Sequence, residues 1–264
     1  MASSQTRLLL AIANLVGFVL VVVVNALATI IPLGGMTTGQ LSDLYPNLFV
    51  PAGLTFSIWG IIYLLLGIYV LYGLVFTVRK PEPTKGFIEK VGILFIVSCI
   101  ANVGWIFSWQ YRVLPLSLVC MVLLLFSLIL IYNRLSIGQR SATASEKYMV
   151  HLPMSVYLGW VSIATIANVT VLLVFYKWNR FGVDEQIWAV FMVAVGILLG
   201  LVMLFYRKDI FYAIVIDWAF LGILLKRTSV DGSAAHAVSV ASIIGMCLLT
   251  FGVVMQIARG KVYR

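Results

Sequence analysis

Residues 148–176 read YMVHLPMSVYLGWVSIATIANVTVLLVFY, and this stretch sets the class of protein. It contains no Asp, Glu, Lys or Arg. A helix needs about 20 mainly apolar residues to cross the hydrocarbon core of a bilayer, because each residue advances the helix by about 1.5 Å. The stretch therefore predicts a membrane-spanning helix.

Seven further apolar runs flank this stretch, and short polar or charged segments separate them. The 264 residues are 62% hydrophobic and 10% charged. A soluble domain carries roughly 25% charged residues, so this composition excludes a water-exposed globular protein of the same size. We expect an all-α polytopic membrane protein, a helical bundle of about eight transmembrane helices. The predicted spans are residues 8–31, 51–78, 91–110, 113–132, 148–176, 187–206, 210–225 and 234–258.

The seventh run, residues 210–225, is the shortest and leaves two interpretations open. A helix of about 16 residues is roughly 24 Å long, less than the ~30 Å hydrocarbon core. Basic side chains at both ends can reach the headgroups and let such a helix span the membrane. Otherwise the run is re-entrant. The basic residues at its ends are Arg207, Lys208, Lys226 and Arg227.

The net charge of +9 is distributed unevenly along the chain. With eight spans, 13 of the 18 Lys and Arg residues fall on the side of the two termini. Because loops rich in Lys and Arg stay in the cytoplasm, we expect both termini to be cytoplasmic, an orientation that fits a bacterial inner membrane. The partner of these basic residues is then membrane lipid, through its anionic headgroups, and no nucleic acid.

The segment between the first two spans, residues 32–50, is the longest predicted loop. It contains Gly34, Gly35 and Gly39, and its single charged residue is Asp43. Loops of this length in compact bundles often form lids or binding loops. We therefore expect either a lid on the non-cytoplasmic side or a passive, ordered connection.

Aromatic and amide residues recur inside three spans at helical spacing. Trp160, Ala164 and Asn168 follow one another at i, i+4 and i+8, so they share one face of the fifth helix. A cavity with apolar walls and a few fixed hydrogen-bond donors suits a flat, mostly hydrophobic ligand. Alternatively, the rings pack a core and the amides join neighbouring helices. The second and third spans carry comparable pairs, which are Trp59 with Tyr63 and Asn102 with Trp105.

Three sequence motifs occur in these same spans. They are PAGLTFSIWGIIY at residues 51–63, ANVGW at residues 101–105 and YLGWVSIATIAN at residues 157–168. In order and spacing they resemble the second, third and fifth helices of the TspO/MBR family, the translocator proteins or tryptophan-rich sensory proteins. The sequence departs from that pattern where Ala52 follows a single proline and where Val156 precedes the tyrosine.

This resemblance implies a five-helix transmembrane core over residues 1–179, with residues 180–264 forming an extension of three transmembrane helices. It also implies a pocket, closed by the first loop, for a small hydrophobic ligand such as a porphyrin, haem-type tetrapyrrole or sterol, used in sensing or transport. Trp105 and Trp160 would supply stacking surface, Ala164 space, and the amides orienting hydrogen bonds. The resemblance assigns to the pocket Trp59, Tyr63, Asn102, Trp105, Trp160, Ala164 and Asn168.

Asp217 is the acidic residue that lies inside an apolar run. A carboxylate at the centre of a spanning helix costs about 2.5–3.5 kcal/mol on insertion scales, so it must face the protein interior, be protonated or pair with a cation. One interpretation is a neutral acid hydrogen-bonded to a neighbouring helix. The other is proton or cation coupling, which would make the protein a proton-coupled secondary transporter of a small organic solute.

The sequence gives no sign of an enzyme or of a metal site. The nucleophile, base and orienting residue that covalent catalysis needs are not apparent, and the three cysteines lack metal-ligand spacing. Small residues recur at every fourth position in the last helices, at Gly196 and Gly200 and again at Ala237, Ala241 and Gly245. Such stripes allow close helix packing, either within the chain or in a homodimer.

Overall fold

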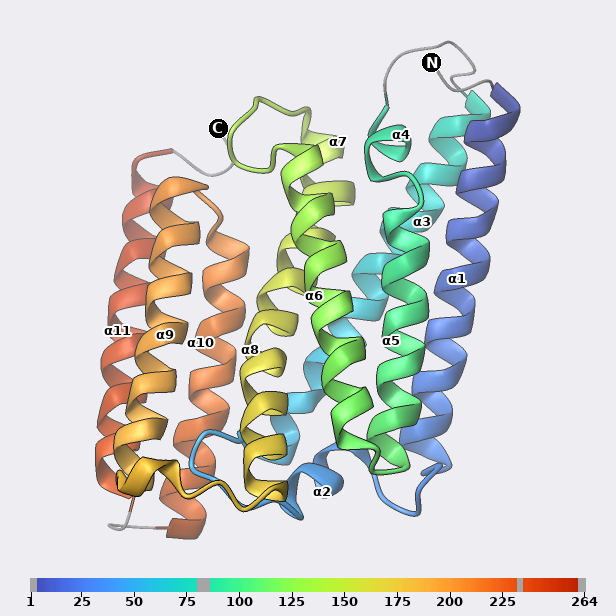
Figure 1. Ribbon diagram of the computed structural model, residues 1–264. Helices are drawn as coiled ribbons and strands as arrows, with labels where there is room; N and C mark the ends of the chain where they lie inside the picture. Colours follow the sequence, from blue (N-terminus) through green and yellow to red (C-terminus); the bar gives the residue numbers. More distant parts are fainter. Residues whose placement is uncertain (1–3, 80–85, 232–234, 261–264) are drawn as a thin grey trace.

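The computed structural model describes residues 4–79, 86–231 and 235–260. The chain is 83% helical, and no strand occurs within these ranges. Figure 1 shows long helices that alternate in direction, with the start of α1 and the end of α11 at the same end of the bundle. The all-α polytopic membrane bundle predicted from the sequence is confirmed.

Eight long helices build the bundle within the described residues. Their bounds agree with the predicted spans to within four residues, because each apolar run stops at charged or turn-forming residues, except that α3 begins at Ile58 and not at residue 51, since a 3-10 turn, Gly53–Ser57, precedes it. Residue 234, the predicted start of the last span, lies outside the described residues. The helices are α1 (Ser4–Ile30), α3 (Ile58–Arg79), α5 (Leu94–Gln110), α6 (Leu114–Leu135), α8 (Leu152–Phe175), α9 (Glu185–Tyr206), α10 (Ile210–Lys226) and α11 (His236–Ala258).

Six helical segments in the described part of the chain are long and apolar enough to cross a membrane by length and composition. The other two long helices, α5 and α10, have 17 residues each. However, α10 continues directly into a π-helical turn, Arg227–Asp231. In Figure 1, α10 runs beside α9 and α11 along the bundle. The seventh run therefore does not turn back as a re-entrant segment.

The last three helices pack together and against α8 (Figure 1). Gly196 of α9 allows the close approach: a Cβ there would lie 3.0 Å from the Phe220 ring of α10 and 3.3 Å from Cδ1 of Ile163 of α8. Gly200, one turn further, faces Leu249 of α11 in the same way. This small-residue stripe thus packs helices within the chain. The predicted boundary at residue 179 falls in the connection between α8 and α9.

Short helical elements occupy the connections. They are α2 (Thr38–Asp43), a 3-10 turn (Gly53–Ser57), α4 (Phe87–Val91), α7 (Ala144–Glu146), a π-helical turn (Lys147–His151) and a second 3-10 turn (Arg180–Gly182). Three of them begin with a side-chain cap, which is Thr37 for α2, Thr143 for α7 and Asn179 for the second 3-10 turn.

The first loop, residues 32–57, is ordered and crosses the end of the bundle opposite the start of α1 (Figure 1). Its helix α2 begins with a capping box, in which Thr37 Oγ1 accepts from the Gln40 amide at 3.3 Å and Gln40 Oε1 accepts from the Thr37 amide at 2.8 Å. Such reciprocal bonds satisfy two amides that the helix leaves unpaired. Trp109 of α5 holds the same helix through a 3.2 Å bond from Nε1 to the Thr38 carbonyl.

The first loop is also fastened to α9 and α10, and we call these contacts the loop clasp. The Ala52 amide donates to the Gly222 carbonyl of α10 at 2.9 Å, and Trp218 Nε1 donates to the Thr55 carbonyl at 2.9 Å. The loop clasp consists of these two bonds, the Leu48 amide to Glu185 Oε1 bond of 3.2 Å, and the Asp43–Lys226 ion pair.

Candidate ligand-binding site

Aromatic side chains from three spans meet behind the first loop. Trp59 of α3 stacks on Trp105 of α5, with ring centroids 5.4 Å apart and an angle of 30° between the planes. Trp160 of α8 meets Trp59 edge-on at 6.2 Å. Rings held by three different helices form a fixed wall of stacking surface. The aromatic cluster is defined as Phe56, Trp59, Tyr63, Trp105, Tyr157 and Trp160.

Two indole N–H groups in the aromatic cluster have no hydrogen-bond partner among the described residues. They belong to Trp105, which is 3% exposed, and Trp160, which is 2% exposed. Buried donors normally find a partner, because leaving one unpaired costs about 1–3 kcal/mol. Both donors are therefore available to an acceptor on a bound molecule.

A small cavity of about 30 Å³ lies against these rings. Ser42 and Pro51 of the first loop close it on one side, and Asn168 and Val171 of α8 line another. Pockets for drug-sized ligands measure roughly 300–1,000 Å³. The closed cavity therefore has space for a water molecule or two, and a larger ligand requires the surrounding side chains to move.

A second, larger pocket of about 570 Å³ adjoins the aromatic cluster between α1, α2 and α3. Its lining includes Asn25 of α1, Gly39 of α2 and Tyr63 of α3. Phe56 and Trp59 line both this pocket and the small cavity. These two rings are therefore the partition between the two spaces.

Comparison with known protein families shows to which family the chain belongs. A family model described as TSPO-like protein matches residues 11–255. The chain belongs to this family. The matched range begins in α1 and ends in α11, so the helices α9 and α10 lie entirely within it. No curated protein and no solved structure matches the chain.

The TSPO-like chain brings together most of the residues that the sequence predicted for the pocket. Trp59, Trp105, Trp160, Ala164 and Asn168 all line the small cavity. Spacing predicted that Trp160, Ala164 and Asn168 share a helix face, because they lie at i, i+4 and i+8, and the resemblance to the TspO/MBR family added Trp59 and Trp105. Tyr63 lies apart from the cavity: it lines the larger pocket and stacks on Trp59 at 5.6 Å.

Asn102 lines neither space and instead joins three helices. Its side chain is 0% exposed, and its Oδ1 accepts from Asn25 Nδ2 of α1 at 2.8 Å. Its Nδ2 donates to the Tyr157 hydroxyl of α8 at 3.1 Å. Sequence reasoning placed neither Asn25 nor Tyr157 at the site. An amide inside the apolar run of α1 was the available signal, because intramembrane polar residues usually face the protein interior.

Asn168 also has a protein partner in this TSPO-like fold. Its Nδ2 donates to Ser117 Oγ of α6 at 3.0 Å, and both residues are buried. Since Asn168 borders the cavity while bonded to α6, it fixes the position of α8 beside the rings. Groups of three or more His, Cys, Asp or Glu side chains that could hold a metal ion do not occur in the described part of the chain.

Asp217 lies in the middle of α10, away from the aromatic cluster. It is half-buried against α11, and its Oδ2 accepts from Thr250 Oγ1 at 2.9 Å. It lines neither the small cavity nor the larger pocket. The hydrogen bond between Thr250 and Asp217 thus joins α11 to α10.

We predict that Asp217→Asn leaves ligand binding at the aromatic cluster unchanged, within about twofold. Asparagine is nearly the same size as aspartate and keeps an oxygen that can accept from Thr250. The measurement is the affinity for protoporphyrin IX at pH 6 and pH 8 in the two proteins. A large loss of affinity, or a pH dependence that disappears in the variant, would instead support a coupling role for Asp217.

Proposed function

We propose that this TSPO-like protein binds a flat, mainly hydrophobic ligand, such as a tetrapyrrole, at the aromatic cluster, for sensing or transport. The observation that carries the proposal is the pair of buried, unpartnered indole donors of Trp105 and Trp160 beside stacked rings. A planar conjugated ligand matches both features, because its faces stack on indoles and its polar edge accepts hydrogen bonds.

Entry of such a ligand requires the partition between the two spaces to open. Phe56 belongs to the 3-10 turn Gly53–Ser57 of the first loop, whereas Trp59 belongs to α3. Rotation of Phe56 would join the small cavity to the adjoining pocket of about 570 Å³. The joined space falls within the roughly 300–1,000 Å³ typical of ligand pockets. The first loop thus acts in this proposal as a lid, which is one of the two interpretations that the sequence left open.

The proposed orientation places the first loop outside the cytoplasm. The start of α1 and the end of α11 share one end of the bundle (Figure 1), and the spans predicted from the sequence assign 13 of the 18 Lys and Arg residues to that side. Under the positive-inside rule that end is cytoplasmic, as expected for a bacterial inner membrane. A ligand would then reach the aromatic cluster from the non-cytoplasmic side.

The test is quenching of tryptophan fluorescence as the purified protein in detergent is titrated with protoporphyrin IX. We expect saturable quenching at micromolar concentrations. Trp160→Phe should weaken the affinity at least fivefold, because the variant loses the indole donor and part of the stacking surface. The midpoint of the titration gives the affinity, so the lower total fluorescence of the variant does not affect it.

Phe126→Leu is the control, because Phe126 is exposed on α6 and lines neither the small cavity nor the larger pocket. Its titration midpoint should equal that of the unmodified protein. Circular dichroism of both variants checks that the helices remain. Quenching that never saturates, or an affinity that Trp160→Phe leaves unchanged, would refute the assignment of the aromatic cluster as the binding site.

A further inference from the structure

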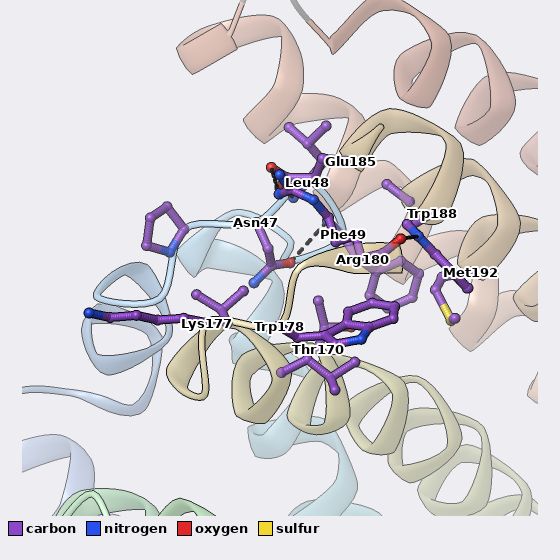
Figure 2. Close-up of a pocket in the computed structure, with 14 residues that line it drawn as sticks. Asn47, Leu48, Phe49, Thr170, Lys177, Trp178, Arg180, Glu185, Trp188 and Met192 are labelled. Atoms are coloured by element: carbon purple, nitrogen blue, oxygen red, sulfur yellow. Dashed lines mark hydrogen bonds and ion pairs between the residues drawn. The ribbon is translucent and has the colours of Figure 1, made fainter. Parts of the chain in front are cut away.

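A third pocket, of about 310 Å³, lies where the first loop meets the connection between α8 and α9. Figure 2 shows its lining residues, which come from the first loop, from the end of α8 with the connection after it, and from the start of α9. None of them belongs to the aromatic cluster, so this pocket is a separate space. From here on it is called the loop pocket.

The loop pocket is apolar at its deep end and charged at its mouth. Thr170, Leu173 and Lys177 follow one another along the last turns of α8 and the residues after it, and Met192 faces them from α9. Seven residues of helix correspond to about 10 Å, so the apolar end lies roughly that far from the Lys177 position. A molecule that fills the pocket must therefore be amphipathic and short.

Aromatic rings form the walls of the loop pocket. Trp178 and Trp188 meet edge to face, with ring centroids 5.1 Å apart, and Phe49 of the first loop is fully buried beside them. Trp188 Nε1 donates to the Arg180 carbonyl at 3.0 Å, which holds that ring in place. Planar walls of this kind favour a ligand with an aromatic or other flat apolar body.

Of the two basic residues at the mouth, one is paired with an acidic side chain and the other is not. Arg180 pairs with Glu185 at 3.2 Å, and the second carboxylate oxygen of Glu185 accepts from the Leu48 amide at 3.2 Å. Both oxygens of Glu185 are thus occupied, and its charge is balanced by Arg180. Lys177 forms no ion pair with any described acidic residue, so the three charged side chains that line the pocket, Lys177, Arg180 and Glu185, carry a net charge of +1, while Asp184 lies in the same connection without lining the pocket.

The backbone around the mouth adopts an unusual conformation. Lys177, Arg180 and Phe181 have φ values of 53°, 57° and 55°, in the left-handed region that residues other than glycine rarely adopt. Such conformations persist where the surrounding contacts impose them, and they are frequent at binding sites. Lys177 and Arg180 both line the pocket, and in Figure 2 the side chain of Lys177 extends to the side away from Trp188.

We propose that the loop pocket binds a small soluble carboxylate with a flat apolar body, such as a two-ring aromatic acid. The carboxylate lies at Lys177, and the apolar body lies between Trp178, Trp188 and the deep end. The pocket is too short for the chains of a diacyl lipid. This proposal does not depend on a ligand at the aromatic cluster, because the two sites share no residue.

The test is calorimetric titration of the full-length protein, in nanodiscs of neutral phosphatidylcholine, with 1-naphthaleneacetate and with 1-naphthaleneacetamide. The two probes have the same rings and differ in charge. We expect the acetate to bind at least fivefold more tightly than the amide. Lys177→Gln should remove about fivefold of the acetate affinity, as expected for one partly screened charge, and leave the amide unchanged. Added salt should reduce the difference between the probes.

Two further variants keep this test decisive. Arg112→Gln removes an exposed cation from the same end of the bundle without lining the loop pocket, so it should change neither affinity. Thr170→Phe fills the deep end and should abolish binding of both probes, with the thermal unfolding midpoint showing that the bundle remains folded. Equal affinity for the two probes, or an effect of Arg112 equal to that of Lys177, would overturn the proposal. Displacement of the acetate by dihexanoylphosphatidylglycerol would overturn the soluble source and assign the pocket to a lipid anion.

Discussion

Replacing Gly222 with alanine is expected to separate the first loop from α10 and to cause a large loss of stability. A Cβ at this position would lie 1.9 Å from Thr55 Oγ1 and 2.7 Å from Thr55 Cγ2, far inside van der Waals contact. Overpacking of this kind typically costs about 1–3 kcal/mol, and here it also strains the bond from the Ala52 amide to the Gly222 carbonyl. The unfolding midpoint in detergent should fall by several degrees, and the affinity for protoporphyrin IX should fall with it.

A second substitution and a matched glycine make the Gly222 result specific. Thr55→Gly in the same chain removes every atom that the new methyl group meets, so the double variant should recover most of the midpoint. Gly60→Ala is the control, because a Cβ there has no atom within 4 Å and alanine favours the helix. Equal unfolding midpoints for Gly222→Ala and Gly60→Ala would contradict the close approach of the first loop and α10.

Replacing Ala164 with phenylalanine is expected to abolish tetrapyrrole binding while the protein stays folded. Ala164 lines the small cavity beside Trp160 and is only partly buried, so the new ring projects into the cavity, where the surrounding side chains move aside for it as they would for a ligand. We expect the affinity for protoporphyrin IX to fall at least tenfold, because the ring takes the place of the ligand. Fluorescence titration gives the affinity, and circular dichroism gives the helix content.

Val169→Phe is the control for this substitution. Val169 lies five residues further along α8, is 37% exposed and does not line the small cavity. It introduces the same ring on another face of the same helix, and the affinity should stay within twofold of the unmodified protein. Unchanged binding in Ala164→Phe would exclude the small cavity as the place where the ligand lies.

The helices were predictable from the sequence because each apolar run is long and ends at charge or at turn-forming residues. The rings that line the cavity were predictable for a related reason, since Trp160, Ala164 and Asn168 share a helix face whatever the neighbouring helices do. The periodicity of one helix does not show which residue of a neighbouring helix each side chain contacts. The bonds from Asn102 to Asn25 and Tyr157 therefore became visible only in three dimensions.

The loop pocket was not predictable for the same physical reason. Trp178 and Trp188 have the positions of ordinary membrane-interface aromatics, and Arg180 has that of a basic residue reaching the headgroups. Their role changes because Leu48, separated by 137 residues from Glu185, docks beside them. Contacts between residues so far apart in the sequence depend on the packing of the whole bundle. The spacing of residues along a single sequence does not predict that packing.

The loop clasp has a consequence for the synthesis of the protein. Thr55 and Trp218 are 163 residues apart in the chain, and Asp43 and Lys226 are 183 residues apart. A ribosome adds roughly 5–20 residues per second, so the first loop waits on the order of ten seconds or longer before its anchors on α10 exist. During this interval α1, α3, α5, α6 and α8 can insert, and the first loop can be held at α2 by Trp109 of α5, but its bonds to α9 and α10 cannot yet form. Closure of the site is therefore among the last events of biogenesis, completed when the final helices enter the membrane.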